Sequence, residues 1–226
     1  MKTIRCKPGR ARRAVRSMIV LLCVLAAYVL LSGMKLTPRA AIRTGEQYYG
    51  IYEPTHTVTV QRIRVDGRSC RVYLTAGKNT LYCGAARLTL SGWDNIFMGK
   101  AIVCADGESV HAGSWCTSAL SFIWGQELLF GRIDDPDIAL LTIEEWGGRD
   151  RTHPAGENGE LRRLRTINVE GFIEDGGYRY FLLDAHERAE GAESYAADYS
   201  VMYVVGCDAS GREILRCEVP DSANGL

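Results

Sequence analysis

The chain has 226 residues, 46% of them hydrophobic and 24% charged, which are globular values and exclude a chain that is disordered throughout. The formal net charge is zero, yet residues 1–34 carry seven basic and no acidic side chains, while the remainder carries 20 basic and 27 acidic ones. A nucleic-acid partner is therefore not expected for the acidic remainder, because binding phosphates requires a basic surface.

The N-terminal segment has the pattern of a membrane signal anchor. A basic tail, residues 1–17, precedes the uncharged run MIVLLCVLAAYVLLSGM at residues 18–34. As a helix this run would measure about 26 Å, just enough to cross a thin bilayer core. Basic residues are fewer after the run than before it, which predicts a cytoplasmic tail and an extracytoplasmic remainder.

Two alternatives to the anchor stay open. A cleaved signal peptide would use the same basic and apolar regions, although the best cleavage site, Leu31-Ser32-Gly33, is poor. A lipoprotein signal is not expected, because Cys23 follows Leu21 and Leu22 where small residues are needed. The other alternative is a buried core helix, which would normally show a polar face. The sequence thus favours a single-pass bacterial membrane protein with an uncleaved signal anchor, a transmembrane helix.

Residues 35–54 are polar and predict a juxtamembrane linker. The segment contains three tyrosines, Tyr48, Tyr49 and Tyr52. Two interpretations of these side chains remain, contact with lipid headgroups and packing onto the following domain.

From His56 onward, short alternating runs separated by turn dipeptides predict antiparallel strands. The first run, residues 56–65, changes phase at Gln61–Arg62, which predicts a β-bulge there. In the next run Cys70, Val72 and Leu74 share one face. Similar runs follow at residues 86–90, 96–103, 138–143, 167–169, 178–183, 201–205 and 214–219.

Residues 55–220 are therefore predicted to form an extracytoplasmic, mainly β domain of antiparallel sheets, with a β-sandwich as the expected architecture. No phosphate-binding glycine motif is present, and strands do not alternate with long helices, so a parallel α/β fold is not expected. Residues 118–130 and 185–197 fit a helix as well as a strand or loop, and residues 149–163 predict a long exposed loop.

Six cysteines fall in the predicted domain, and their spacing suggests neighbouring pairs: Cys70, Cys83, Cys104, Cys116, Cys207 and Cys217. A structural disulfide is predicted among the first four, with Cys70–Cys83 favoured and Cys104–Cys116 next. Cys207 and Cys217 are not expected to bond to each other, because a tight hairpin at 208–211 would separate them by about 17 Å. Two alternatives remain, reduced buried cysteines and a metal site made by Cys104, His111 and Cys116.

Candidate catalytic and metal residues give no coherent site. The stretch Gly107-Glu108-Ser109-Val110-His111 resembles a nucleophile elbow but lacks its second glycine. Asp134, Asp135 and Asp137 are oxygen ligands of the kind calcium uses, yet their spacing around Pro136 favours a turn. Glu144 and Glu145 are adjacent on a predicted strand, so they should point to opposite faces and not act as an acid/base pair. The four tryptophans are predicted as core anchors: Trp93, Trp115, Trp124 and Trp146. The catalytic residues are thus unknown, and no cofactor or metal is expected.

Three segments carry a resemblance to a class of proteins. They are FGRIDDPDI at 130–138, GYRYF at 177–181 and VGCDASGREI at 205–214. With these segments the chain resembles small uncharacterised extracytoplasmic proteins and lipoproteins of Gram-positive bacteria, which share a glycine-aromatic strand and a closing Asp-x-x-Gly hairpin. The chain departs from them in having no lipobox cysteine. The resemblance implies an exported β-rich domain and brings no activity with it.

These observations predict a membrane-anchored extracytoplasmic binding or assembly module with no identifiable catalytic site. The alternative is an anchored cell-surface hydrolase whose catalytic residues are dispersed. The expected partners are the membrane and another cell-envelope protein or ligand, without nucleic acid. A deep polar cleft would favour the hydrolase, whereas a flat patch or an exposed sheet edge would favour the binding module.

Overall fold

The computed structural model describes residues 8–65, 68–116, 127–148, 162–185 and 199–219. These residues form two helices and twelve strands, which pair only in antiparallel fashion, so the prediction of a mainly β chain with antiparallel sheets is confirmed. The elements, in chain order, are α1 (Pro8–Leu31), α2 (Pro38–Tyr48), β1 (His56–Val65), β2 (Arg68–Ala76), β3 (Thr80–Thr89), β4 (Gly92–Val103), β5 (Val110–Cys116), β6 (Glu127–Ile133), β7 (Leu140–Gly148), β8 (Arg162–Asn168), β9 (Ile173–Asp175), β10 (Tyr178–Asp184), β11 (Tyr199–Cys207) and β12 (Glu213–Glu218).

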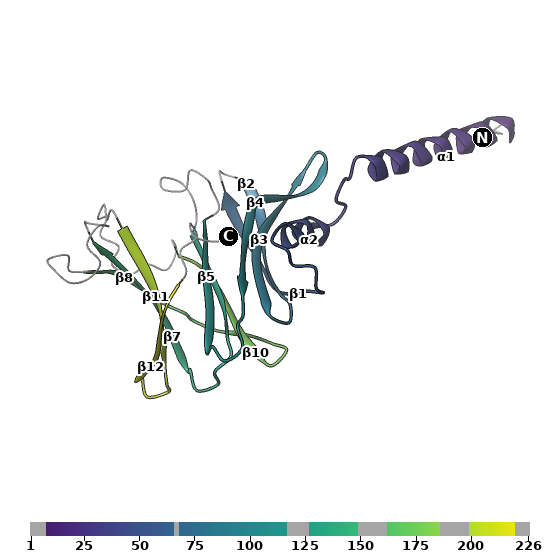
Figure 1. Cartoon of the computed structure of the whole chain (residues 1–226). Helices are drawn as coiled ribbons and strands as arrows, with labels where there is room; N and C mark the ends of the chain where they lie inside the picture. The colour runs from purple at the N-terminus through teal and green to yellow at the C-terminus, as the bar shows by residue number, and fades with distance from the viewer. Residues whose placement is uncertain (1–7, 66–67, 117–126, 149–161, 186–198, 220–226) are drawn as a thin grey trace, which may run out of the picture.

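The strands form three four-stranded sheets that are stacked as layers across the view of Figure 1. Sheet A has the order β1-β2-β3-β4, sheet B the order β5-β6-β10-β9, and sheet C the order β12-β11-β7-β8. Sheet B is the middle layer, and α2 covers the outer face of sheet A. The face-to-face packing typical of a β-sandwich therefore occurs twice in this molecule.

The middle position of sheet B follows from two strands that are apolar on both faces. Leu128 and Phe130 of β6 pack in the core cluster shared with sheet A, whereas Leu129 between them packs in the cluster shared with sheet C. Strand β10 repeats the pattern, with Leu182 toward sheet A and Phe181 toward sheet C. Because side chains alternate along a strand, such continuous apolar runs require a cover on each face.

Residues 35–54 do not form the predicted linker, because α2 lies within them and packs on sheet A. Thr37 caps the helix by accepting a hydrogen bond from the Ala40 amide at 3.2 Å, and Pro38 follows as its first residue. Ile42 of the helix is fully buried against the outer face of sheet A. The linker prediction is therefore wrong for this segment, which is part of the folded domain.

Strand β1 contains the predicted irregularity at a different place. The register with β2 shifts between Thr57 and Thr59, two to four residues before the phase change at Gln61–Arg62 that predicted a bulge. Other details agree with the sequence: Cys70, Val72 and Leu74 share the core-facing side of β2. Residues 118–126, 149–161 and 186–197, where a helix or a long loop was predicted, lie outside the described residues, while 127–130 belong to β6.

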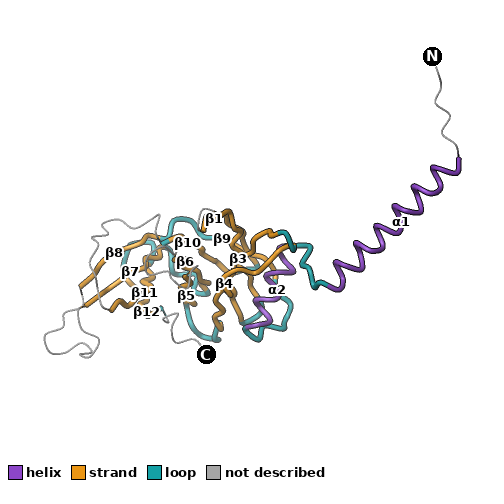
Figure 2. Tube along the Cα trace, turned by 90° about the horizontal axis from the view of Figure 1, so that it is seen from above, coloured by secondary structure: helices purple, strands orange, loops and turns teal. Residues whose placement is uncertain are grey.

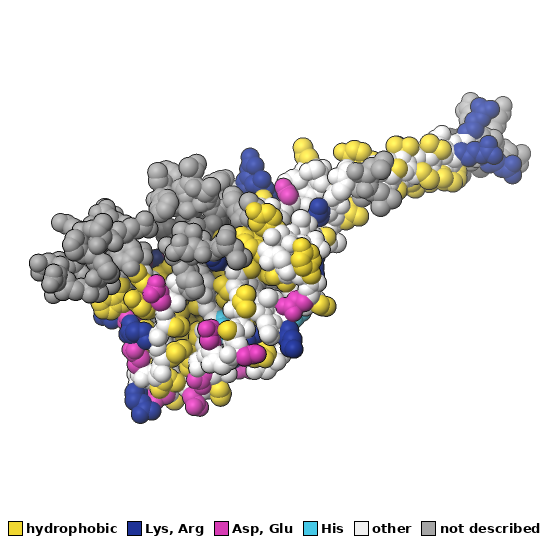
Figure 3. All heavy atoms as spheres, in the orientation of Figure 1, with side chains coloured by type: hydrophobic (Ala, Val, Ile, Leu, Met, Phe, Trp, Pro, Cys, Tyr) yellow, Lys and Arg dark blue, Asp and Glu magenta, His cyan; other side chains and the backbone are white. Residues whose placement is uncertain are grey.

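Helix α1 extends away from the sheets (Figures 1 and 2). Its side chains at residues 12–28 are exposed, with apolar groups around the middle and basic ones toward the N-terminal end (Figure 3). Within the part of the chain that the structure describes, no helix reaches the length and hydropathy expected of a membrane span.

The strand registers separate the cysteines that were considered as pairs. Cys83 lies opposite Leu74, four residues along β2 from Cys70, or about 13 Å at the rise of a strand. A disulfide requires Cα atoms within about 7 Å, so this register is incompatible with the predicted Cys70–Cys83 bridge. For Cys104–Cys116, the Cys104 thiol is free, whereas the Cys116 side chain lies outside the described residues.

Cys207 and Cys217 are also kept apart, as the hairpin argument predicts. Cys217 pairs with Val204, and Cys207 pairs with Glu213, so the two cysteines are staggered along the hairpin. Both thiols are free. The turn between the strands is closed by the Asp208 carboxylate, which accepts hydrogen bonds from the Ser210 and Arg212 amides.

Candidate functional site

A cleft lies where one edge of each sheet meets. It has a volume of about 570 Å³ and is lined by β4 of sheet A, the turn before β5 with the start of β5 in sheet B, and β12 of sheet C. Each of these strands is the last in its sheet, so each has one edge without a neighbouring strand in the described residues. Since sheet B is the middle layer, β5 lies between the other two strands and forms the floor of the cleft.

The direction of the main-chain groups in β5 follows from one hydrogen bond. The Ser109 carbonyl accepts from the Asp134 amide at 2.9 Å, so the backbone of residue 109 points toward β6. Because main-chain groups alternate in direction along an antiparallel strand, those of Val110 and Ala112 point away from β6. Both residues line the cleft, so the floor offers main-chain donors and acceptors at strand spacing.

The walls of the cleft are mainly apolar, and three charged residues are also among its lining. Ile102 of β4 lies on one side, and Leu215 and Cys217 of β12 lie on the other. Charged groups are contributed by Lys100, Glu108 and Glu218. An apolar slot with main-chain hydrogen-bonding groups along its floor is suited to an extended polypeptide.

His111 lies beside the cleft and is buried, with 3% of its surface exposed. Its Nδ1 is 3.1 Å from a Glu108 carboxylate oxygen, and its Nε2 is 3.4 Å from an Asp134 carboxylate oxygen. Neither nitrogen has the alignment of a hydrogen bond within the described residues. His111 is therefore not a surface residue, and its burial makes it unsuited to take a proton from a bulky substrate.

Asp134 is held by a second contact that fixes this corner of the molecule. Arg132 donates to both of its carboxylate oxygens at 2.6 Å, a bidentate pair. The Arg132 guanidinium also lies 4.4 Å from the centre of the Tyr178 ring. Burial lowers the pKa of Arg132, but the hydrogen bonds to Asp134 outweigh this and raise it above its ordinary value. Arg132 is therefore charged, and its ion pair with Asp134 has a structural role.

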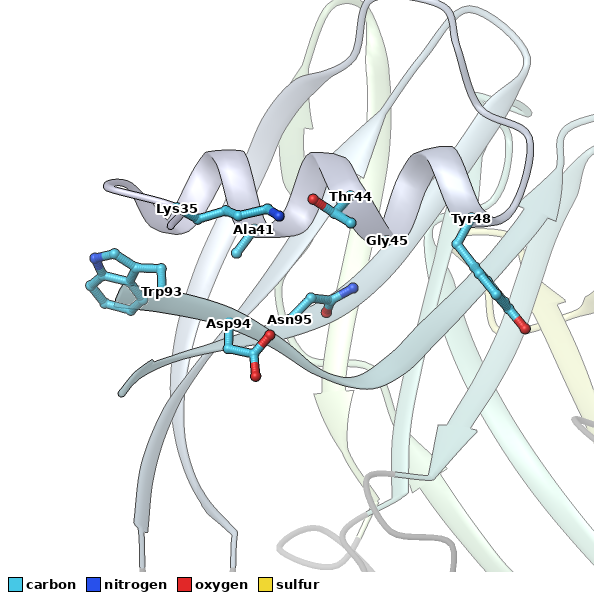
Figure 4. A pocket seen from close by; sticks show the side chains of 8 residues that line it. All are labelled: Lys35, Ala41, Thr44, Gly45, Tyr48, Trp93, Asp94 and Asn95. Carbon is cyan, nitrogen blue, oxygen red and sulfur yellow. The ribbon is translucent and has the colours of Figure 1, made fainter. Parts of the chain in front are cut away.

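A second, smaller pocket of about 190 Å³ lies between α2 and β4. Figure 4 shows Thr44 and Tyr48 of the helix on one side and Trp93, Asp94 and Asn95 of β4 on the other. Gly45 brings the two elements together, because a Cβ at that position would lie only 2.0 Å from the Tyr82 hydroxyl. The close approach therefore requires glycine.

A buried carboxylate, Glu46, fastens α2 to the sheet beside this pocket. It accepts hydrogen bonds from Arg39 at 2.8 Å, Arg43 at 3.0 Å, Thr55 at 2.8 Å and Thr75 at 2.7 Å. Burial would raise the pKa of Glu46, but the hydrogen bonds, that of Thr75 foremost, outweigh it and hold the pKa below its ordinary value. With four donors and no exposed surface, Glu46 acts as a structural anchor for the helix.

Apart from His111, which lies beside Glu108 and Asp134, the residues considered as catalytic or metal-binding candidates are not grouped with one another. The Asp135 carboxylate accepts from the Asp137 amide at 2.9 Å, which is the turn predicted around Pro136. Glu144 is bound by Arg216 at 2.9 Å, whereas Glu145 is bound by Arg165.

Arg165 also binds Glu127 of sheet B at 2.9 Å, so Glu145 faces the space between the sheets. Glu144 accepts from the indole of Trp146, the residue two positions further along β7, and therefore lies on the opposite face from Glu145. The prediction that these two glutamates point to opposite faces is confirmed.

The remaining candidates have structural surroundings. His56 lies 2.7 Å from Asp175 and connects β1 to β9, while His153 and His186 lie outside the described residues. Trp115 is buried in the core as predicted, Trp93 and Trp146 are half-buried, and Trp124 is not described. Among the described residues, no three His, Cys, Asp or Glu side chains are grouped as metal ligands.

Comparisons with protein-family models, with curated proteins and with solved structures found no match. The resemblance to extracytoplasmic proteins of Gram-positive bacteria therefore stays a prediction.

Two features of these sites were not predicted from the sequence. The helix that carries Glu46 could have been found from its Thr37-Pro38 start and from Arg39, Arg43 and Glu46, which recur at helical spacing. The cleft could not, because nothing in the sequence of a strand says which other sheet its free edge will lie beside.

Proposed function

We propose that the chain is a membrane-anchored extracytoplasmic binding module that holds an extended segment of a partner polypeptide in the cleft between β4, β5 and β12. The observation that carries the proposal is the free edge of β5, which lies as a floor between two apolar walls. Addition of a strand to such an edge is a common mode of peptide recognition.

The anchoring part of the proposal is supported by α1 and by the residues before it. The run at residues 18–34 contains no charge, and its side chains at residues 18–28 are exposed. Apolar groups exposed in such number are costly in water and favour an apolar environment such as a bilayer. The seven basic residues before the run favour a cytoplasmic N-terminus.

A polypeptide is favoured over other ligands by the chemistry of the floor. Main-chain groups of Val110 and Ala112 repeat at the spacing of a strand, and only another extended chain repeats complementary groups at the same interval. The apolar walls can receive the alternate side chains of that strand. A partner with apolar residues at every second position fits this cleft best.

The experiment uses the full chain, reconstituted in detergent micelles, and a display library of random peptides as the probe. Peptides selected on the wild-type chain are measured again on Ala112→Pro. This substitution removes an outward amide and keeps the pairing of β5 with β6, because proline is tolerated at the free side of an edge strand. Amide hydrogen exchange monitors the fold of the variant.

We expect the selected peptides to alternate apolar and polar residues, to protect amides of β5 from exchange, and to lose most of their affinity for Ala112→Pro. Equal binding to a folded Ala112→Pro variant, or protection elsewhere in the chain, would refute the cleft as the binding site. Cleavage of bound peptides by the wild-type chain would instead favour the hydrolase alternative.

A further inference from the structure

The hairpin between β3 and β4 ends in a turn whose chemistry is unusual. Thr89 pairs with Gly92, so the turn consists of Leu90 and Ser91. Two-residue hairpin turns favour glycine, asparagine and aspartate, and leucine offers no advantage for the backbone there. Leu90 is nevertheless fully exposed, and Leu88 on the same strand is 63% exposed. The turn geometry does not account for two exposed leucines at the tip of a projecting hairpin.

The hairpin is fixed beside the point where the chain leaves α1. The Trp93 amide donates to the Lys35 carbonyl at 2.8 Å, and these two residues form a β-bridge. Gly92 permits the contact, since its φ is +101° and a Cβ there would lie 2.7 Å from the Lys35 carbonyl oxygen. Lys35 directly follows the uncharged run at residues 18–34, so the base of the hairpin tip is bound to the first residue after that run.

The distance by which the hairpin tip projects matches the thickness of the lipid headgroup layer. The headgroup layer on each side of a bilayer is about 5–8 Å thick. Trp93 lies opposite Leu88, so Leu90 in the turn projects about two residues, or roughly 7 Å, beyond it, and the tip can reach this layer if residues 18–34 span the bilayer. The hairpin projects on the side of the domain from which α1 leaves, as Figures 1 and 2 both show.

The side chains around the tip have the composition of interfacial segments. Leu36 is exposed next to Lys35, and Trp93 is half-buried with the Arg71 guanidinium 5.1 Å from its ring centre. Tryptophan and basic residues are enriched at the level of the headgroups. The turn also satisfies some of its own polar groups, because the Thr89 hydroxyl donates to the Gly92 carbonyl at 2.8 Å. Contact with lipid would therefore leave fewer polar groups unpaired.

We propose that the β3–β4 hairpin tip, residues 88–93, is a second membrane-contacting element that inserts Leu88 and Leu90 among the lipid headgroups beside the anchor. This inference rests on the membrane attachment in the proposed function. Its consequence is a fixed orientation: α1 alone would leave the domain free to tilt, whereas α1 together with the hairpin holds it in one attitude to the bilayer.

The test uses the full chain in vesicles of phosphatidylcholine and phosphatidylglycerol. A photoreactive benzoylphenylalanine replaces, in separate variants, Leu90 at the hairpin tip, Val24 in α1, or Leu140 in sheet C. Leu140 is the matched control, because it is another exposed leucine at the start of a strand in the sheet farthest from α2. After irradiation, mass spectrometry identifies which variants have become bonded to lipid.

We expect lipid adducts at positions 24 and 90 and no lipid adducts at position 140. Adducts at 24 without adducts at 90 would overturn the hairpin inference and leave the anchor intact. Absence of adducts at 24 would instead overturn the membrane attachment itself. Adducts of position 90 to a second protein chain, or equal lipid adducts at 90 and 140, would also overturn the inference.

Discussion

Replacing Glu46 with alanine should detach α2 from sheet A. The carboxylate is fully buried, and Thr75, which donates to it, is fully buried as well. Without Glu46 the Thr75 hydroxyl loses its closest hydrogen-bond acceptor, and the guanidinium groups of Arg39 and Arg43 lose their carboxylate partner. The helix would then be held mainly by its apolar contacts, such as Ile42.

The magnitude follows from the number and exposure of the partners. A hydrogen bond to a charged group contributes about 1.5–3 kcal/mol to stability, and breaking a buried ion pair costs about 3–5 kcal/mol. The side chains of Arg39 and Arg43 are about one third exposed, 34% and 29%, so water can replace part of their loss. We therefore expect Glu46→Ala to lower the free energy of unfolding by about 3 kcal/mol. Glu46→Gln, which keeps an acceptor but not the charge, should cost about half as much, roughly 1.5 kcal/mol.

The contribution of the Glu46 carboxylate to stability should also depend on pH. The pKa of Glu46 is lowered in the folded chain, so its contribution to stability is fully present above the unfolded pKa of about 4.5 and is lost as the pH falls through the folded value. The unfolding free energy of the wild-type chain should therefore fall below pH 4.5 by more than that of Glu46→Gln. A gap between the two chains that stays constant with pH would refute the ionised state of Glu46.

Urea unfolding of the full chain in detergent, followed by tryptophan emission, measures these differences. Amide hydrogen exchange in α2 serves as the local measurement, because a detached helix exchanges before the sheets unfold. Glu174→Ala is the control, since Glu174 is exposed on β9 and its loss should leave the unfolding midpoint unchanged. A cost below about 1 kcal/mol for Glu46→Ala, with α2 still protected from exchange, would refute the described network.

Further predictions concern the core, the hairpin, the thiols and the topology. Phe181→Ala, in the cluster between sheets B and C, should cost about 3–5 kcal/mol in urea unfolding, and a cost near zero would contradict the middle position of sheet B. Gly92→Ala should destabilise the hairpin by about 1–3 kcal/mol because of its positive φ, measured as faster amide exchange in residues 88–93 and contradicted by unchanged exchange. Burial raises the pKa of Cys104 to about 11, so about one thiol in a thousand is ionised at pH 8, and alkylation there should require urea; rapid native labelling would disprove its burial. A membrane-impermeant thiol reagent on intact reduced cells should label an engineered Ser222→Cys and not Thr3→Cys, and the reverse pattern would refute the proposed orientation.

The parts of the fold that were predicted from the sequence depend on local alternation. Cys70, Val72 and Leu74 alternate with polar neighbours, so their common face follows from strand geometry alone. The turn at Asp208 follows equally from local chemistry, because its carboxylate closes the loop over four residues. These features need no knowledge of which strands lie beside one another.

The layering and the cysteine pairing could not be predicted in the same way, because they depend on distant partners. Whether Cys83 lies opposite Cys70 or Leu74 is decided by the register of two strands, and the spacing of 13 residues permits either. The adjacent apolar residues of β6 and β10 did contain a signal for a sheet covered on both faces. The identity of the two covering sheets still depends on tertiary packing. The candidate cleft depends on that packing as well: residues 107–111, which line it, were considered only for catalysis or metal binding and not as part of a peptide-binding site.

The three sheets also differ in where their strands lie along the sequence. All of sheet A comes from one continuous segment, residues 56–103, whereas sheets B and C share the rest of the chain in alternation: β5 and β6, then β7 and β8, then β9 and β10, then β11 and β12. If the chain emerges from its N-terminus during synthesis, sheet A and α2 can assemble early, but their inner face with Val72 and Leu74 stays uncovered until β5 and β6 arrive, and its cover is complete only with β10. Sheet C is complete only when β12 has followed. A polypeptide that stalls between residues 103 and 178 would therefore present a finished sheet whose apolar face is open or only partly covered, and this interval is where aggregation or the help of a chaperone matters most.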